Sequence, residues 1–325
     1  MKPFRFHAGR RLRVAVGIAS LCVMLVCAAA LVFLTVVQPA RADAGIDAAR
    51  AAYRGEEVPA SASAASSAAP GAGAASGTGA APASGDLGAL RKINGDVRGW
   101  ISIPGTVIDY PVLLPPASSP DYYLHRDWRG EQSRYGSVFF DAGSGGADAR
   151  NRVLYGHSMK DGRMFAALLH YAELGFYRAH PVVYLNGDGG RAAWKIFAVI
   201  KVNTDPSQGA PFNYRKTSFA SDEAFLEYLY GVRVRSVLDL PVDLSPSDPI
   251  LTLSTCSYEF DGFRTAVLAR RTRPGESESV ETALASANAR ALYPDCWYLK
   301  YGGSKPALPD FKRALADGAV PWLKR

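Results

Sequence analysis

Cysteine is scarce in this chain of 325 residues, and the positions of the four cysteines exclude one class of protein. Cys22 and Cys27 lie inside a long apolar run near the N-terminus, which leaves Cys256 and Cys296 for the rest of the chain. Exported domains that depend on disulfides carry an even framework of several cysteines. The chain is therefore not built on disulfides. Cys256 is either a reactive thiol or a buried structural one, and Cys296, in a C-terminal extension, is expected to be a bystander.

The chain also lacks the signatures of several ligands. No acidic residue precedes residue 14, and five of the seven net positive charges lie there, so the remainder is close to neutral and carries no long basic stripe. This distribution argues against nucleic-acid binding. No glycine-rich phosphate loop leads from a strand into a helix, and no zinc spacing or EF-hand loop is present. We therefore expect neither a cofactor nor a metal.

Charged residues are absent from residues 14–37, an apolar run long enough as a helix to cross a hydrocarbon core of about 30 Å. The basic segment 1–13 before it predicts a cytoplasmic N-terminus, with the rest of the chain outside a single-pass membrane anchor. The alternative is a cleaved signal peptide, because Ala40-Arg41-Ala42 fits a cleavage site. The run is longer than the usual signal core of about 7–15 residues, which favours the anchor.

Composition divides the rest of the chain into three parts. Residues 43–58 are charged and Ala-rich and predict a short helix, and residues 60–85 are almost wholly Ala, Ser, Gly and Pro, so 38–85 is interpreted as a helix followed by a flexible linker. Residues 86–273 are predicted to form the folded domain. Residues 274–325 form a C-terminal extension of unknown role, with a weak helical stripe over 276–292.

Short strand-like runs punctuated by Gly and Pro dominate the folded domain. They cover residues 99–103, 107–113, 137–141, 152–155, 182–185, 194–202, 249–255 and 263–271. Helical spacing occurs at 87–93, 164–171 and 222–230, the last with Ser221 as a predicted N-cap. Many short strands with a few inserted helices predict a mainly β fold, a barrel or a sandwich, in place of alternating βαβ units.

The last two strand-like runs form a predicted hairpin that suggests thiol chemistry. Residues 257–262 join the runs, and a hairpin symmetric about Phe260 places Cys256 directly opposite Arg264. Cross-strand partners have Cβ atoms about 4.5–5.5 Å apart. A guanidinium at that distance lowers the pKa of a thiol. The hypothesis is therefore a cysteine nucleophile with an arginine as its electrostatic partner.

A histidine at the end of another strand supplies a proton carrier. His157 follows the run 152–155 beyond a glycine, and loops at strand ends often carry site residues. Thiol acyl transfer needs such a group, whereas the other four histidines resemble cytoplasmic, surface or capping residues. The alternative is structural: a buried thiol at Cys256 and a surface Arg264 paired with Glu259 or Asp261.

These residues belong to a set of strings that resembles the class B sortases, from about residue 93 to residue 273. The strings are Gly99-Trp100, Ile103-Pro104-Gly105-Thr106, Ile108-Asp109-Tyr110-Pro111-Val112, Asp121-Tyr122-Tyr123-Leu124, Tyr135-Gly136-Ser137, Tyr155-Gly156-His157, Met159-Lys160-Asp161-Gly162, Met164-Phe165, Phe176-Tyr177, His180-Pro181 and Thr252-Leu253-Ser254-Thr255-Cys256, followed by Arg264. Several separate motifs occur in the order and spacing of the family, which makes the resemblance specific.

The resemblance implies an eight-stranded sortase β-barrel behind a transmembrane helix and cysteine transpeptidation at the Gram-positive cell envelope. It implies that Cys256 is the nucleophile, that His157 is the proton donor and acceptor, and that Arg264 stabilises the oxyanion or the substrate. Ser254 and Thr255 match positions that line the substrate groove. Some relatives carry an acid directly after the cysteine, where this chain has a serine, so the role of that acid does not transfer.

The implied partners are secreted proteins with a C-terminal sorting signal of the NPxTN or LPxTG type. The acceptor is an amine of a peptidoglycan precursor or, in a pilin-polymerising enzyme, a lysine of a pilin. Two other classes stay open: an L,D-transpeptidase, whose Ser-His-Gly-Cys-like string is absent here, and a tethered binding domain without enzymatic activity. The sequence leaves the sorting motif and the acceptor open.

Overall fold

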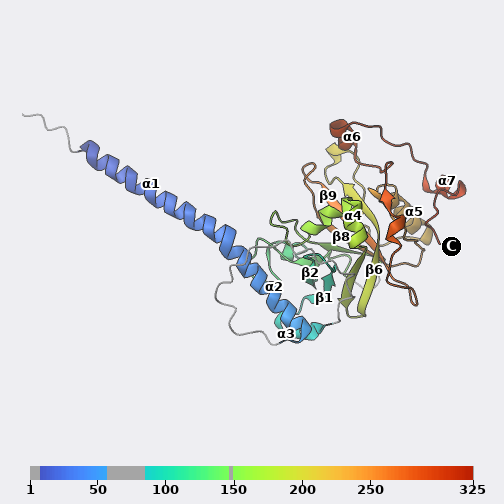
Figure 1. Ribbon diagram of the computed structural model, residues 1–325, viewed down its shortest axis with the longest axis horizontal. Coiled ribbons are helices and arrows are strands. Elements are labelled where there is room, and N and C mark those ends of the chain that lie inside the picture. The colour runs from blue at the N-terminus through green and yellow to red at the C-terminus, as the bar shows by residue number, and fades with distance from the viewer. Residues whose placement is uncertain (1–7, 57–84, 146–148, 325) are drawn as a thin grey trace, which may run out of the picture. The chain divides into compact units, whose positions relative to one another are not determined.

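The apolar run near the N-terminus forms a long helix in the computed structural model, which describes residues 8–56, 85–145 and 149–324 (Figure 1). The chain divides into two compact units, Met1–Ala48 and Ala49–Arg325. Most of the predicted basic segment 1–13 and of the predicted linker 60–85 lies outside the described residues. The predicted boundaries at 38, 86 and 274 stay predictions.

The described residues of the first unit are helical. α1 (Ala8–Val32) passes through a π-helical turn (Phe33–Val37) into α2 (Gln38–Arg54). Among the described residues, one helical stretch, Arg13–Arg54, is long and apolar enough to cross a membrane. Its large apolar side chains between residues 14 and 36 are exposed, unlike those of a core helix in a soluble protein. The unit therefore fits a candidate membrane span.

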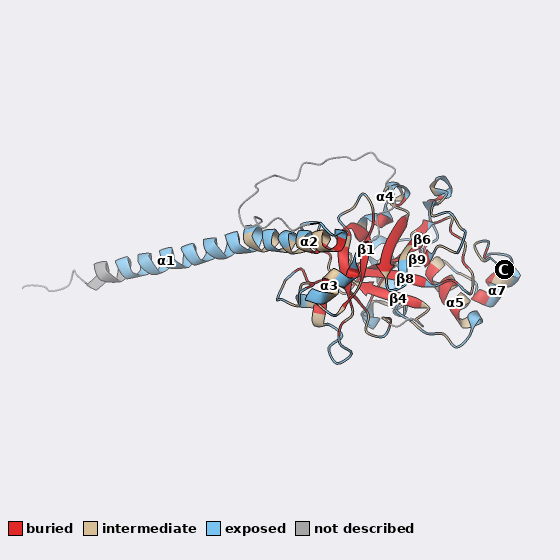
Figure 2. Cartoon of the chain, turned by 90° about the horizontal axis from the view of Figure 1, so that it is seen from below, coloured by how far each residue is buried: buried red, intermediate tan, exposed pale blue. Residues whose placement is uncertain are grey.

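Eight strands of the second unit close into a barrel, as predicted from the sequence. They are β1 (Val97–Ser102), β2 (Asp109–Leu113), β3 (Val138–Phe140), β4 (Asn151–Tyr155), β5 (Val182–Gly187), β6 (Gly190–Val202), β8 (Ile250–Cys256) and β9 (Arg264–Arg271). Their order around the barrel is β1-β2-β3-β4-β8-β9-β6-β5. β7 (Leu238–Asp239) and β10 (Ser286–Ala287) pair separately. Figure 2 shows the barrel strands largely in the colour of buried residues.

Two kinds of pairing bring distant segments together around β8. β4 and β8 run parallel, with Tyr155 level with Ser254, although about a hundred residues separate them. β8 and β9 form the predicted antiparallel hairpin, in which Cys256 is paired with Arg264. The two strands therefore end at one edge of the barrel beside the start of β9.

Helices pack around the barrel, and α5 begins at its predicted cap. α3 (Leu87–Ile93) matches the expected range, and α5 (Asp222–Arg233) begins after Ser221, whose hydroxyl accepts a hydrogen bond from the amide of Ala224. α5 packs its apolar face on β6, β8 and β9. α4 (Leu174–Ala179) follows a short 3₁₀ helix, η3 (Ala166–Ala172).

The predicted helix at 164–171 is 3₁₀ and begins two residues late. Met164 has a positive φ of 58°, in the left-handed region that a helix cannot start from. A bridge between Ser158 and Met164 folds this loop back, and Phe165 donates its amide to the carbonyl of His157. The turn leaves room for only a short, tight helix.

The predicted helical stripe over 276–292 is wrong. That segment contains a single 3₁₀ turn, η5 (Thr282–Leu284), and the short strand β10. Its backbone pairs with the connection between α5 and β7, since Asn288 donates to the carbonyl of Val237 and Leu292 to that of Val234. These tertiary hydrogen bonds outweigh a weak periodicity. Two helices, α6 (Asp295–Tyr301) and α7 (Phe311–Ala316), follow.

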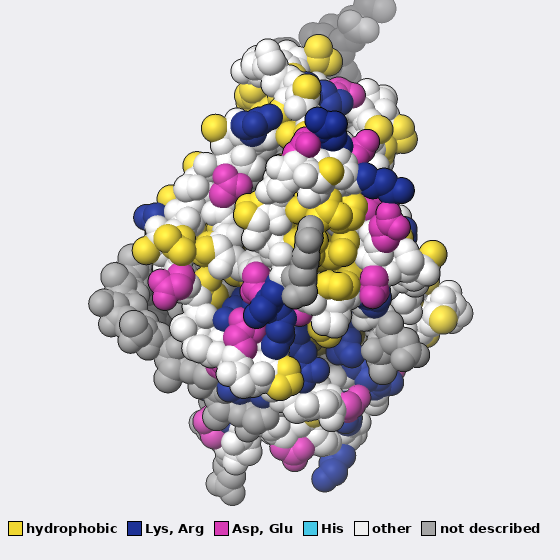
Figure 3. All heavy atoms as spheres, turned by 90° about the vertical axis from the view of Figure 1, so that its right-hand side faces the viewer, with side chains coloured by type: hydrophobic (Ala, Val, Ile, Leu, Met, Phe, Trp, Pro, Cys, Tyr) yellow, Lys and Arg dark blue, Asp and Glu magenta, His cyan; other side chains and the backbone are white. Residues whose placement is uncertain are grey.

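Charges of both signs are interspersed on the surface. On the face shown in Figure 3, basic and acidic side chains alternate around a central apolar patch. This mixture agrees with the near-neutral charge of the chain beyond its first thirteen residues.

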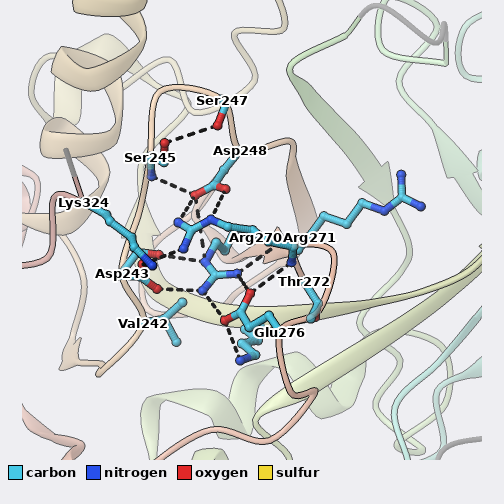
Figure 4. A network of polar contacts seen from close by, with 12 residues as sticks. Val242, Asp243, Ser245, Ser247, Asp248, Arg270, Arg271, Thr272, Glu276 and Lys324 are labelled. Carbon is cyan, nitrogen blue, oxygen red and sulfur yellow. Dashed lines mark hydrogen bonds and ion pairs between the residues drawn. The ribbon is translucent and has the colours of Figure 1, made fainter.

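A buried arginine joins the end of β9 to the start of the extension (Figure 4). Arg270 is 1% exposed and donates to Asp243 at 2.7 Å and to Glu276 at 2.6 and 2.7 Å. Lys195 of β6 donates to Glu276 at 2.7 Å. The hydrogen bonds from Arg270 hold the pKa of Glu276 well below its usual range, although burial opposes them. The ion cluster therefore stabilises the charged carboxylate.

We expect Glu276→Gln to lower the free energy of unfolding at pH 7 by about 2 kcal/mol, because charge-assisted hydrogen bonds to a buried arginine are lost. The pKa of Glu276 is lower in the folded than in the unfolded protein, so its contribution is complete above the unfolded pKa of about 4.3 and is lost as the pH falls. The difference from wild type should therefore shrink below about pH 4. Chemical denaturation of the detergent-solubilised chain measures both effects.

The matched control is Glu278→Gln, which removes the more exposed ion pair with Arg191 and should cost less than about 1 kcal/mol. Equal losses in the two variants, or a difference for Glu276→Gln that grows in acid, would contradict the role of the cluster.

Candidate active site

Cys256 ends β8 and is paired with Arg264, the first residue of β9. Directly opposite residues in an antiparallel pair point to the same face of the sheet. Both side chains are half-buried, and the thiol is free. The hairpin thus presents a sulfur and a guanidinium side by side, as the sequence predicts.

The parallel pairing of β4 with β8 brings His157 to the same edge. Beyond the last strand pair, the amide of Gly156 donates to the carbonyl of Ser254 at 3.3 Å, and the hydroxyl of Thr255 donates to the carbonyl of Gly156 at 2.7 Å. These bonds extend the pairing to Gly156 and Thr255. The next residues along the two strands are His157 and Cys256. All three predicted residues lie at the ends of three adjacent strands.

The imidazole of His157 is oriented by a backbone carbonyl. Its Nε2 lies 2.7 Å from the carbonyl oxygen of Leu124. A carbonyl only accepts, so Nε2 carries a proton and Nδ1 is the nitrogen left to exchange one. The exposed ring of His125 lies 5.9 Å from that of His157, so this predicted surface residue also borders the site. The backbone thus sets the ring nitrogen available for chemistry.

Arg264 carries a charge that no neighbour neutralises. Its Nη1 donates to its neighbour's carbonyl, that of Phe263, and within the described parts of the chain no carboxylate lies at ion-pair distance from it. Glu259 was one of the two carboxylates expected to pair with Arg264 if Arg264 were a surface residue without a catalytic role. Its Oε1 instead lies 2.6 Å from Nζ of Lys201. The positive charge of Arg264 is therefore free to act on a thiolate or an oxyanion.

A buried tyrosine that no sequence motif identified contacts the strand that carries Cys256. The hydroxyl of Tyr214 lies 2.9 Å from Oγ of Ser254. Burial raises the pKa of Tyr214, while the bond to Ser254 and the charges of Arg215 and Arg264 oppose that rise. Tyr214 lies in the connection between β6 and α5, where no periodicity or motif marked it.

Ser254 and Thr255 are buried, and both hydroxyls have partners inside the protein. Ser254 pairs with Tyr214, and Thr255 donates to the first residue beyond β4. In this structure the two side chains align the strands that carry the site. Their contact with a substrate stays a prediction.

The loop that joins Cys256 to Arg264 is held on three sides. Tyr258 donates its hydroxyl to the carbonyl of Ser158 at 2.7 Å, beside His157. Thr204 and Gln208, beyond β6, donate to the carbonyls of Gly262 and Asp261, at 2.8 and 2.9 Å. These contacts fix both halves of the loop to the barrel.

The third support comes from the C-terminal extension. Lys300 of α6 donates to the carbonyl of Glu259 at 2.8 Å, and its Nζ lies 4.7 Å from the centre of the Phe260 ring. Trp297 and Tyr301 of the same helix pack against Phe260, with ring centres 6.4 and 5.9 Å apart. The extension, to which the sequence assigned no role, thus clamps the loop beside the thiol.

The chain is similar to known proteins over its folded domain. The Sortase domain model matches residues 101–272, just over half of the chain. Sortase B of Listeria monocytogenes is 39% identical over 177 residues, 54% of this chain and 69% of the relative. Sortase B of Staphylococcus aureus is 33% identical over 169 residues, 52% of this chain and 66% of the relative.

Solved structures show the same likeness. Clostridium perfringens sortase B matches with a TM-score of 0.51 and 35% identity, over 57% of this chain and 98% of the other. The Staphylococcus aureus sortase B–substrate complex matches with a TM-score of 0.52 and 32% identity, over 57% and 84%. The family match and these relatives indicate a cysteine transpeptidase of the sortase type, and the closed barrel with a thiol at a strand end agrees with it. The chain belongs to the sortase family, and its relatives are sortases of class B.

We expect Lys300→Met to speed amide hydrogen exchange in residues 257–263 by roughly tenfold, because one hydrogen bond and one cation–π contact are lost, together about 1–2 kcal/mol. Exchange measured by mass spectrometry on the full chain tests this. Lys312→Met is the control, since that exposed lysine lies on α7, 3.4 Å from Glu223. Unchanged exchange in the loop of the Lys300 variant would show that α6 does not clamp it.

Proposed function

We propose that the chain is a membrane-anchored class B sortase that cleaves a sorting motif after threonine and transfers the protein to a cell-wall amine. The observation that carries this proposal is the meeting of His157, Cys256 and Arg264 at the ends of three adjacent strands. Membership of the sortase family supports the reaction class.

In the first step, the thiolate of Cys256 attacks the backbone carbonyl carbon of the threonine in the motif. A carbon–sulfur bond forms, and the carbonyl oxygen gains negative charge that Arg264 stabilises. His157, protonated on both nitrogens, gives a proton to the departing amine as the peptide bond breaks. The product is a thioester on Cys256, and the C-terminal fragment leaves.

In the second step, an amine of the acceptor attacks the thioester. A carbon–nitrogen bond forms and the carbon–sulfur bond breaks, which returns the thiolate to Cys256. His157 accepts the proton that the amine loses, so the catalyst is restored to its starting charge. We propose a peptidoglycan precursor as the source of this amine and an NPxTN-like motif as the donor. The alternatives are a pilin lysine and an LPxTG-like motif.

The long apolar helix is proposed to anchor the enzyme in the cell membrane. Its exposed apolar side chains match the length of a bilayer core, and basic residues precede it. The N-terminus then lies in the cytoplasm and the barrel outside, where secreted substrates and wall precursors meet. The alternative of a cleaved signal peptide exports the same barrel.

Replacing the nucleophile should abolish the covalent intermediate. We expect Cys256→Ala to form no adduct with a sorting-motif peptide, because no other group supplies the sulfur of the thioester. Intact-protein mass spectrometry of the trapped enzyme measures the adduct. Cys296→Ala is the control and should keep it, since Cys296 lies on α6 in the extension. An adduct that survives in the Cys256 variant would refute the assignment.

Arg264→Ala should lower the rate of thioester formation by about 10²–10³-fold, the usual cost of one oxyanion donor. Arg264→Lys should recover little of this loss, because the compact ammonium lacks the planar fork of the guanidinium. Single-turnover cleavage of a peptide reports the rate, with Arg290→Ala in the exposed part of the extension as the control. A lysine variant close to wild type would show that charge alone suffices.

A further inference from the structure

A second candidate site lies at the opposite end of the strands that carry Cys256. A cavity of about 230 Å³ opens where β4 and β8 begin and β9 ends, beside the first half of β6. Arg152, Trp194 and Arg271 line it, together with Arg150 and Asp248. Because the catalytic residues lie at the other ends of β4, β8 and β9, this cavity is separate from the active site.

Strand pairing fixes the two residues at the centre of the cavity. Trp194 of β6 is directly opposite Arg271 of β9, so the indole and the guanidinium share a face of the sheet. In Figure 4 the side chain of Arg271 extends away from the ion cluster around Arg270. The arginine therefore does not join the carboxylates that neutralise its neighbour.

The indole of Trp194 carries a buried donor without an acceptor. Trp194 is 3% exposed, and its Nε1–H has no hydrogen-bond partner in the structure. A buried donor left unsatisfied costs about 1–3 kcal/mol. Trp194 therefore lines the cavity with an indole whose donor is unused and closed to solvent in this structure.

Arg152 and Arg271 line the same cavity, and their positive charges repel each other. In the part of the chain that the structure describes, neither Arg152 nor Arg271 forms an ion pair. Burial lowers the pKa of Arg152, and the charge of Arg271 lowers it further. A bound anion would relieve both effects.

The other charged residues that line the cavity already have partners within the protein. Both carboxylate oxygens of Asp248 accept from Arg273, at 2.7 and 2.8 Å, and one also accepts from the amide of Ser245. Arg150 forms an ion pair with Asp222 at 2.9 Å. The uncompensated charge of the cavity therefore comes from Arg152 and Arg271.

We propose that this cavity binds a phosphate group, held between Arg152 and Arg271 beside the indole of Trp194. A tetrahedral oxyanion offers acceptors in several directions, which suits donors on two separate strands, and guanidinium groups match phosphate geometry. The volume exceeds the roughly 30 Å³ share of one water several-fold, so a phosphate ester fits as well as free phosphate.

The indole resonances test the proposal directly. The chain has five tryptophans, and Trp194→Phe identifies the indole signal of Trp194 in a nitrogen-15 spectrum of the full chain in neutral detergent. Inorganic phosphate at constant ionic strength should shift this signal to saturation, and chloride or acetate should not. Arg152→Met and Arg271→Met should each weaken binding at least about tenfold, as expected for a lost charge-assisted hydrogen bond.

Arg290→Met changes the net charge equally, outside the cavity, and should bind phosphate as wild type does. A signal that stays unmoved, that moves as strongly in chloride or acetate, or that responds equally in all three arginine variants would overturn the proposal. Arg271 is exposed at its strand end, so its variant is the one least able to disturb folding.

Further arms distinguish the sources of the phosphate group. Glycerol phosphate tests a soluble ester, and vesicles of phosphatidylglycerol in phosphatidylcholine test a lipid headgroup against vesicles of phosphatidylcholine alone. A response in either arm, in addition to the response to inorganic phosphate, identifies that source, and a response to inorganic phosphate alone identifies free phosphate. Thioester formation on Cys256, measured in the same samples, should stay unchanged with phosphate, which separates this proposal from that of the active site.

Discussion

The parallel alignment of β4 with β8 is the constraint on which the rest of the site depends. A hairpin alone would place Cys256 beside Arg264, but only this second pairing brings a histidine from a hundred residues away to the level of the thiol. A slip of one residue would turn every side chain of β4 to the other face of the sheet. The hydrogen bond from Thr255 to the carbonyl of Gly156 and the buried polar contacts of Ser254 hold the register where the strands end.

The extension is part of the same machinery. It begins at the ion cluster of Arg270 and Glu276, pairs with β7, and returns to the active-site loop through Lys300. Arg270 and Arg264 lie on the same strand, so β9 connects the cluster at one end to the site at the other. A buried arginine without its carboxylates would be costly. The barrel and its extension therefore stabilise each other.

Local patterns in the sequence predicted much of this arrangement. The eight strands, the cap at Ser221 and the pairing of Cys256 with Arg264 follow from alternation, capping chemistry and the symmetry of a short loop. Contacts between distant segments left no local signal. Tyr214 and Lys300 act through such contacts, and no periodicity marks either of them. The helical prediction for the segment 276–292 is wrong for the same reason, since its backbone pairs with β7 and the connection that precedes it, about fifty residues earlier in the chain, and not with itself.

The clamp on the active-site loop also links the order of that loop to a part of the chain that is synthesised later. Synthesis from the N-terminus delivers β8 and β9 before α6. Lys300, which donates to the carbonyl of Glu259, follows the loop by about forty residues in the sequence. Until α6 is in place, the thiol lies on a hairpin that lacks one of its three supports. The contacts around the loop after Cys256 are therefore complete only once α6 of the extension has been synthesised and has folded onto the loop.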